Sequence, residues 1–90
     1  MRPALVISQE VFQTENEHVS LLMITSALHK HWYGDHQIID LNVTGLKSDS
    51  LIRQKIFTID NRLIRAVIGK LSKQDQNKVL ENMALSLAKN

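Results

Sequence analysis

The amino-acid sequence predicts an α+β fold, in which several short strands are followed by one helix. Short apolar runs recur between residues 4 and 71, and apolar and polar residues alternate between residues 50 and 60. A helical spacing of apolar residues appears only after residue 72. Strands first and a helix last is the order typical of α+β rather than α/β proteins. A chain of 90 residues is the size of one small domain.

The first strands are predicted from apolar runs. Residues 4–8 (ALVIS) form a short continuous run, which favours a buried strand. The polar stretch 9–17 has only Val11 and Phe12 as apolar anchors, and we predict no helix there. Residues 18–26 (HVSLLMITS) are apolar on both faces, which is typical of a central strand.

Loops and further strands follow. Residues 29–36 contain Trp32 and Tyr33 before Gly-Asp, a pattern that indicates an irregular loop. We expect a third strand at 37–40, extending toward 43 and ended by a turn at 44–46.

The second half of the chain adds more strands before the helix. The alternation within 50–53 and 55–60 indicates strands with one solvent-exposed face, followed by a turn or short helical turn at 60–61. Residues 63–71 are predicted to form a further strand.

The C-terminal segment carries the signals of a helix. Ser72 is a favourable N-cap residue, and Asp75 stands at the position where a carboxylate can reach back toward free amides. The apolar residues after it fall on one helical face; they are Val79, Leu80, Met83, Ala84 and Leu87.

Composition excludes some classes of protein. The absence of cysteine excludes disulfides, thiolate chemistry and cysteine zinc sites. No apolar run approaches the ~20 residues that cross a membrane, and the start has no signal-like pattern, so we expect a cytoplasmic protein without a membrane partner.

The positive charge is concentrated in one region of the chain. The formal net charge is only +2, but between residues 47 and 73 the basic residues outnumber two acidic ones, Asp49 and Asp60. The basic residues are Lys47, Arg53, Lys55, Arg62, Arg65, Lys70 and Lys73. Such a surplus suits a surface that faces a polyanion, although a solvated charged face has the same appearance.

Four segments together resemble the PemK/MazF family of toxins from type II toxin–antitoxin systems. They are residues 2–8 (RPALVIS), 23–26 (MITS), 50–60 (SLIR and KIFTID) and 68–72 (IGKLS), and the match extends from Arg2 to the C-terminal helix. The resemblance implies a small curved antiparallel sheet, an SH3-like partial barrel of the CcdB/PemK kind, with a C-terminal helix. It also implies a homodimer that cleaves single-stranded RNA without a metal or other cofactor.

The resemblance assigns the catalytic positions to Arg2, Thr25 and Ser26. Arg2 matches the arginine that the family places at the scissile phosphate, where a guanidinium can hold two oxygens and stabilise developing charge. The alternative for Arg2 is a frayed arginine near a chain end. Thr25 matches a strand-end hydroxyl, followed by Ser26, that can donate to phosphate or orient the ribose 2′-OH. The alternative for both hydroxyls is a strand-end cap.

Further basic residues are candidates for RNA binding. Arg53 and Lys55 stand at alternate positions and would share one sheet face if the strand is continuous, so both could bind flanking phosphates. They could equally be solvated edge charges. Arg62 and Arg65 are further candidates of the same kind.

The loop at 29–36 offers chemistry that the resemblance does not require. His29 and His31 are close to Asp35 and His36 in the sequence, but a metal site needs more ligands than such a pair guarantees, so no metal is predicted. Histidine as a general acid or base would suit RNA cleavage. Trp32 and Tyr33 suit either base stacking or structural packing.

The chain departs from the family pattern at its start. Members usually begin with a further strand and loop, whereas here only Met1 precedes the Arg-Pro block, so we expect one domain over 1–90 that is N-terminally truncated relative to the family. A degenerate toxin, a fragment that dimerises through an open edge, and a start site placed too late all remain open.

The expected partners follow from the resemblance. They are single-stranded RNA (mRNA), a cognate antitoxin, DNA when the antitoxin is bound, and a second copy of the chain. The alternative function is a catalytically inactive relative that accepts the disordered acidic segment of an antitoxin in its groove, or pairs with an intact toxin.

Overall fold

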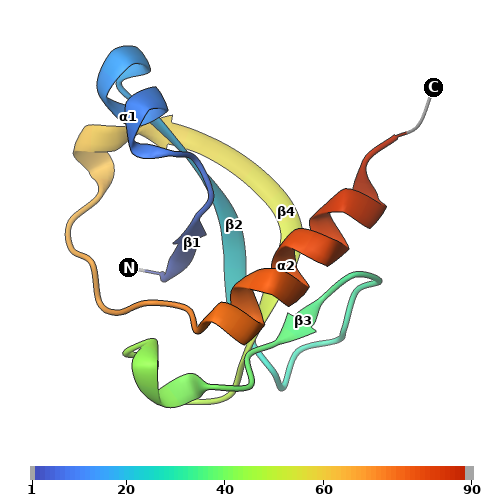
Figure 1. Cartoon of the computed structure of the whole chain (residues 1–90). Helices are drawn as coiled ribbons and strands as arrows, with labels where there is room; N and C mark the ends of the chain where they lie inside the picture. Colours follow the sequence, from blue (N-terminus) through green and yellow to red (C-terminus); the bar gives the residue numbers. More distant parts are fainter. Residues whose placement is uncertain (1, 89–90) are drawn as a thin grey trace.

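A four-stranded antiparallel sheet in the order β1-β2-β4-β3 organises the molecule (Figure 1). The computed structural model describes residues 2–88. The elements are β1 (Ala4–Val6), α1 (Glu10–Asn16), β2 (His18–Ser26), β3 (His36–Gln37), the 3-10 turn η1 (Leu41–Val43), β4 (Ser50–Asp60), the 3-10 turn η2 (Asn61–Leu63) and α2 (Lys73–Ser86).

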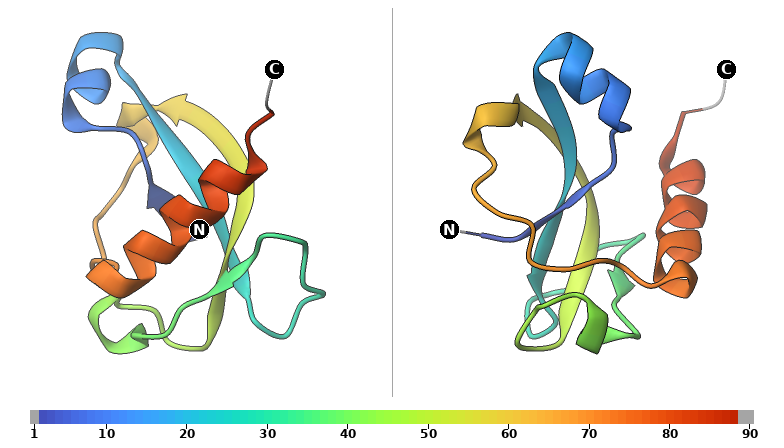
Figure 2. Two further views of the ribbon diagram at one scale, coloured as in Figure 1. Left: turned by 45° about the vertical axis from the view of Figure 1, so that its right-hand side comes forward. Right: turned by 60° about the vertical axis from the view of Figure 1, so that its left-hand side comes forward.

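The long β2–β4 pair is the spine of the sheet. It is paired from His18 opposite Asp60 to Ser26 opposite Ser50. The register shifts in the middle, because Leu22 lies opposite Ile56 whereas Met23 lies opposite Arg53. The two additional residues of β4 form a bulge, which bends the strand and increases its twist. The sheet therefore curls into a half-barrel (Figures 1 and 2).

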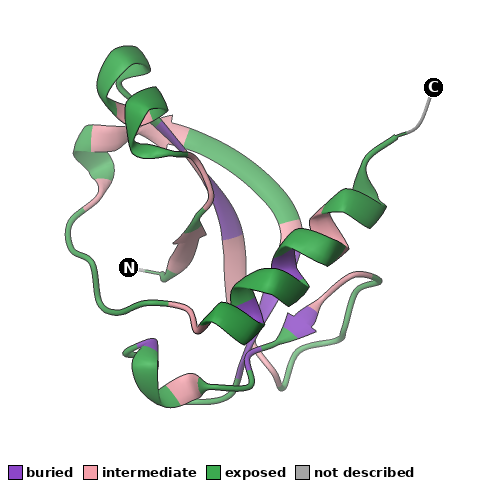
Figure 3. Ribbon diagram, in the orientation of Figure 1, coloured by how far each residue is buried: buried purple, intermediate pink, exposed green. Residues whose placement is uncertain are grey.

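One face of this sheet carries the core. Leu22, Ile38 and Ile52 form a buried cluster with Val79 of α2. The buried residues lie where α2 crosses β2, β3 and β4, while α1 is exposed (Figure 3). At roughly 1.5–3 kcal/mol for each fully buried aliphatic side chain, this cluster holds α2 against the sheet.

The start of α2 is fixed by Asp75, whose side chain is fully buried. Its carboxylate accepts hydrogen bonds from the backbone amides of Ile39 (2.9 Å) and Asp40 (3.0 Å) and from Nε2 of His36 (2.6 Å). Ser72 Oγ donates to the same carboxylate and accepts from the Asp75 amide. The N-terminal end of α2 is thus tied to β3 and the chain after it.

Several predicted elements are confirmed. The central strand has the predicted bounds His18–Ser26, and Ser72 is the N-cap of α2. The loop before β3 and the curled sheet with a C-terminal helix are also present. The two predicted strand pieces at 50–53 and 55–60 are one strand, β4.

The prediction that residues 9–17 contain no helix is wrong, because α1 spans Glu10–Asn16. No residue of α1 is buried, so an apolar stripe, the usual sequence signal of a helix, is missing. Two hydrogen bonds of Gln13, in the middle of α1, attach the helix: Gln13 Nε2 donates to the Ser8 carbonyl, and Asn61 Nδ2 donates to the Gln13 carbonyl.

The prediction of a strand at 63–71 is also wrong. Residues 64–72, which we call the connector, are in no strand, and Val67 is 85% exposed. The connector is attached where the Lys70 amide donates to the Val43 carbonyl (3.0 Å). Gly69 packs so tightly there that a Cβ atom would lie 2.3 Å from the Thr44 carbonyl carbon. A strand needs a backbone partner along its length, and the connector contacts one only near its end.

Two strands differ from expectation in length or burial. The third strand is only His36–Gln37, because the amides of Ile39 and Asp40 donate to Asp75 instead of to β4. The first strand is not buried: β1 is an edge strand paired only with β2, and Val6 is 44% exposed.

Candidate active site

The register of β1 on β2 directs the start of the chain toward Thr25. Ala4 lies opposite Met23 in this antiparallel pair, so the same register, continued two residues before Ala4 and two after Met23, would set Arg2 opposite Thr25. Directly opposed residues project from the same face of a sheet. Since Leu22 packs beneath α2, the odd-numbered neighbours Met23 and Thr25 point to the other face. Figure 2 (right) shows α2 on one side of β2–β4 and the N-terminus on the other.

Thr25 has a histidine partner that the sequence did not reveal. Its Oγ1 lies 2.7 Å from Nδ1 of His29. The chain turns directly after β2, where the His29 amide donates to the Ser26 carbonyl (3.1 Å). This turn folds the His29 ring back onto the end of β2.

Ser26 builds that turn. Its Oγ accepts a hydrogen bond from the Leu28 amide (3.2 Å), which is the capping role that was one of the two alternatives. The turn begins the β2–β3 loop (residues 27–35), and its first amide, that of Ala27, donates to the Asp49 carbonyl.

Arg53 is buried against the β2–β3 loop and is only 6% exposed. Its Nη2 donates to Asp35 (2.9 Å) and to the Lys30 carbonyl (2.7 Å), and its guanidinium lies 4.2 Å from the centre of the Trp32 ring. Burial alone would raise the pKa of the Asp35 carboxyl, but hydrogen bonds from Arg53 and the Trp32 amide hold it below its ordinary value. Arg53 thus fixes the loop that carries His29.

Arg53 and Lys55 lie on one continuous strand, β4, as the expectation of a shared sheet face required. Lys55 stands in the bulge and has no partner in β2, so the shared face stays a prediction. Arg53 is buried by the loop, whereas Lys55 is exposed.

Arg62 and Arg65 lie at the other end of the spine from Thr25. Arg62 follows Asp60, which pairs with His18, and His18 is about 23 Å from Thr25 along β2 at ~3.3 Å per residue. Arg62 pairs with Asp60 (2.8 Å), and the hydrogen bonds of Arg62 lower the pKa of Asp60 to about 2. Arg65 is exposed on the connector.

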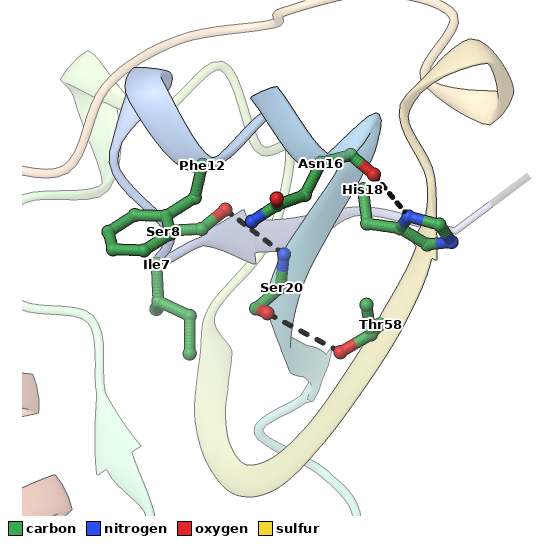
Figure 4. A pocket seen from close by; sticks show the side chains of 7 residues that line it. All are labelled: Ile7, Ser8, Phe12, Asn16, His18, Ser20 and Thr58. Carbon is green, nitrogen blue, oxygen red and sulfur yellow. Dashed lines mark hydrogen bonds between the residues drawn. The ribbon is translucent and has the colours of Figure 1, made fainter. Parts of the chain in front are cut away.

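A cleft of about 410 Å³ lies between α1 and the far end of the spine (Figure 4). Ile7 and Phe12 give it an apolar side; its other lining residues are Ser8, Asn16, His18, Ser20 and Thr58. The polar groups here bind one another: Ser8 Oγ accepts from the Ser20 amide, and His18 Nδ1 is hydrogen-bonded to the Asn16 carbonyl. None of the predicted catalytic residues lines this cleft.

Residues 2–88 contain neither a metal site nor a membrane-spanning helix. No group of three or more His, Cys, Asp or Glu in this range could hold a metal ion. Over the same range, neither helix combines the length and apolarity needed to span a membrane.

The fold is that of small bacterial toxins. An Mtb toxin superposes with a TM-score of 0.80 at 21% identity, over 96% of this chain and 92% of that chain. The Mycobacterium tuberculosis toxin MazF-mt6 gives 0.78 at 21% identity, over 93% and 83%. An endoribonuclease in complex with its cognate antitoxin, from a mycobacterial species, gives 0.76 at 14% identity, over 99% and 84%.

The family model for the PemK-like, MazF-like toxins of type II toxin–antitoxin systems matches residues 1–87. The chain belongs to this family, which confirms the resemblance deduced from its four sequence segments. No curated protein matches the chain.

Proposed function

We propose that this protein is the toxin of a type II toxin–antitoxin pair and that it cleaves single-stranded RNA without a metal ion. The observation that supports the proposal is the β1–β2 register, which, continued two residues beyond the Ala4–Met23 pair, would bring the Arg2 guanidinium and the Thr25 hydroxyl to one sheet face. Membership of the toxin family supports it.

The two side chains supply what RNA cleavage needs from a protein. The nucleophile is the ribose 2′-OH of the substrate, so no nucleophilic side chain is required. The Arg2 guanidinium stabilises the charge that develops on the phosphate oxygens. Thr25 donates its hydroxyl hydrogen to a phosphate oxygen, and the products are a 2′,3′-cyclic phosphate and a 5′-hydroxyl.

The other predicted residues have separate roles in this proposal. Lys55, Arg62 and Arg65 bind phosphates of the mRNA away from the cleaved bond, because contacts between basic side chains and phosphates supply most of the affinity for a nucleic acid. Arg53 positions the β2–β3 loop, and Ser26 shapes its first turn.

The test is cleavage of a short single-stranded RNA in the presence of EDTA. The wild type should cut it, and Arg2→Ala should lower kcat/KM by about 10²–10³-fold, the usual loss when one donor to a developing oxyanion is removed. Lys78→Ala is the matched control, because it removes one positive charge from α2 on the opposite face of the sheet. RNA that stays intact with the wild type, or cleavage that needs the chelated metal, would refute the proposal.

The exposed apolar surface supports binding to other chains, which is the second candidate function. Phe12 beside the cleft is 56% exposed, and Val67 and Ile68 on the connector are 85% and 58% exposed. We propose that a cognate antitoxin segment and a second copy of this chain cover such surfaces, in the cytoplasm. The mycobacterial endoribonuclease with this fold is itself in complex with its cognate antitoxin.

A binding module without catalysis would differ from the enzyme in a simple pair of measurements. Titration with an antitoxin peptide should give binding in both cases, whereas RNA cleavage should occur only in the enzyme. Analytical ultracentrifugation of the free chain measures whether a homodimer forms.

A further inference from the structure

The side chain best placed to move a proton at this site is His29, which the family resemblance did not assign. Its Nδ1 is 2.7 Å from Thr25 Oγ1, and the β1–β2 register, continued beyond Ala4, would bring Arg2 toward the same threonine. Cleavage by the 2′-OH requires a group that removes the proton of that hydroxyl. A guanidinium stays protonated and an aliphatic hydroxyl does not accept the proton near neutral pH, whereas an imidazole does.

We propose that His29 is the general base of RNA cleavage in this protein; the inference rests on the proposed ribonuclease function. One tautomer satisfies every contact. Nδ1–H donates to Thr25 Oγ1, which turns the threonine hydroxyl hydrogen toward a phosphate oxygen. The lone pair of Nε2, on the exposed edge of the ring, then accepts the 2′-OH proton.

The step balances as follows. The 2′ oxygen forms a bond to phosphorus as its proton passes to Nε2 of His29, and the bond from phosphorus to the 5′ oxygen breaks. The 5′ oxygen takes a proton from water, and the imidazolium returns its proton to the hydroxide formed. The neutral imidazole and one water molecule are thereby restored.

The surroundings of His29 keep it in place without blocking Nε2. The Ser26 turn fixes its backbone, and Arg53 holds the following residues of the loop through Lys30 and Asp35. The charged and titratable residues next to it in the loop are Lys30 and His31, and the Asp49 carbonyl accepts from the Ala27 amide at the start of the loop. Arg2 would face Thr25, the partner of the ring, if the β1–β2 register continues.

The test compares the pH dependence of kcat/KM for His29→Gln and His31→Gln. A general base contributes about 10²–10⁴-fold, so His29→Gln should lower kcat/KM by about 10²-fold. It should also change the shape of the pH profile of kcat/KM. His31→Gln, two residues further along the same exposed loop, should keep the wild-type rate and profile.

Chemical rescue separates catalysis from positioning. Free imidazole added to His29→Ala should restore part of the activity, because it can take the proton but cannot orient Thr25. If His29→Gln equals His31→Gln in rate and profile, or imidazole restores nothing, the inference is overturned while the ribonuclease function stands. If the wild type leaves RNA intact at every pH, the proposed function fails and this inference fails with it.

Discussion

Replacing Asp75 by alanine should destabilise the protein more than any exposed substitution. The variant removes the acceptor for two backbone amides, His36 and Ser72. Each buried donor left without an acceptor costs about 1–3 kcal/mol, and the Ile39 and Asp40 amides and the His36 ring all lose theirs, so the total is at least about 3 kcal/mol. A domain of this length has a free energy of unfolding of roughly 5–13 kcal/mol, so the loss is a large fraction of the total.

Two further variants separate charge from hydrogen bonding. Asp75→Asn keeps an oxygen for the backbone amides but loses the charge opposite His36, so it should cost less, about 1–3 kcal/mol. Asp49→Ala is the matched control, because Asp49 is exposed and only its backbone is bound to the loop. That variant should stay within about 0.5 kcal/mol of the wild type.

Urea unfolding followed by circular dichroism measures all three variants. At about 4–8 °C per kcal/mol for a domain of this size, Asp75→Ala should also lower Tm by at least about 12 °C. If Asp75→Ala were as stable as Asp49→Ala, the carboxylate would not anchor α2, and the reasoning on this cluster would be refuted.

The same carboxyl predicts a dependence on pH. Burial alone would raise the pKa of Asp75, but hydrogen bonds from Ile39, His36, Asp40 and Ser72 lower it below its ordinary value of 3.8. A carboxyl whose pKa is lower in the folded state stabilises the fold fully above its unfolded pKa, about 3.9. This contribution is lost as pH falls through the lower folded value, so the acid limb below about pH 4 should be shallower in Asp75→Asn.

Two other variants test the loop and the far end of the spine. Asp35→Asn leaves the buried Arg53 guanidinium without its counter-charge, so it should lower the free energy of unfolding by about 3 kcal/mol. It should also shift the fluorescence emission of Trp32, the only tryptophan. Unchanged fluorescence and stability would contradict the role of Arg53. Arg62→Ala should raise the pKa of Asp60 from about 2 toward 3.8, which NMR titration of the carboxyl measures. A pKa that stays near 2 would show that Arg62 does not cause the low value.

The parts of the fold that the sequence predicts are those with a local signal. The run 18–26 is apolar on both faces, and β2 is indeed a central strand, paired with β1 along one edge and with β4 along the other. Val19, Leu21 and Leu22 of this strand are buried. Ser72 and Asp75 predict the start of α2 because capping is a contact between near neighbours. α1 has no buried face, so nothing in its pattern distinguishes it from a loop.

The rest of the fold and of the candidate site depends on contacts between residues that are far apart in the sequence. The connector has the composition of a strand, but only its partner in space determines whether it forms one. The bulge that contains Lys55 depends on how β4 pairs with β2. The position of Arg2 relative to Thr25 is likewise a matter of register between two strands, and the His29–Thr25 contact depends on the turn that follows β2.

The shortness of β1 has a consequence for how the proposed activity would be governed. Three residue pairs, from Ala4–Met23 to Val6–Leu21, and the hydrogen bond from the Ile7 amide to the Ser20 carbonyl attach this edge strand. Edge strands of this kind open locally at far less free energy than the whole domain requires to unfold. In the proposed mechanism, the fraction of molecules with Arg2 near Thr25 would therefore be an equilibrium of its own. A chain that adds a strand to the edge of β1 would raise that fraction, and one that pulls β1 away would lower it while α2 and the core remain folded.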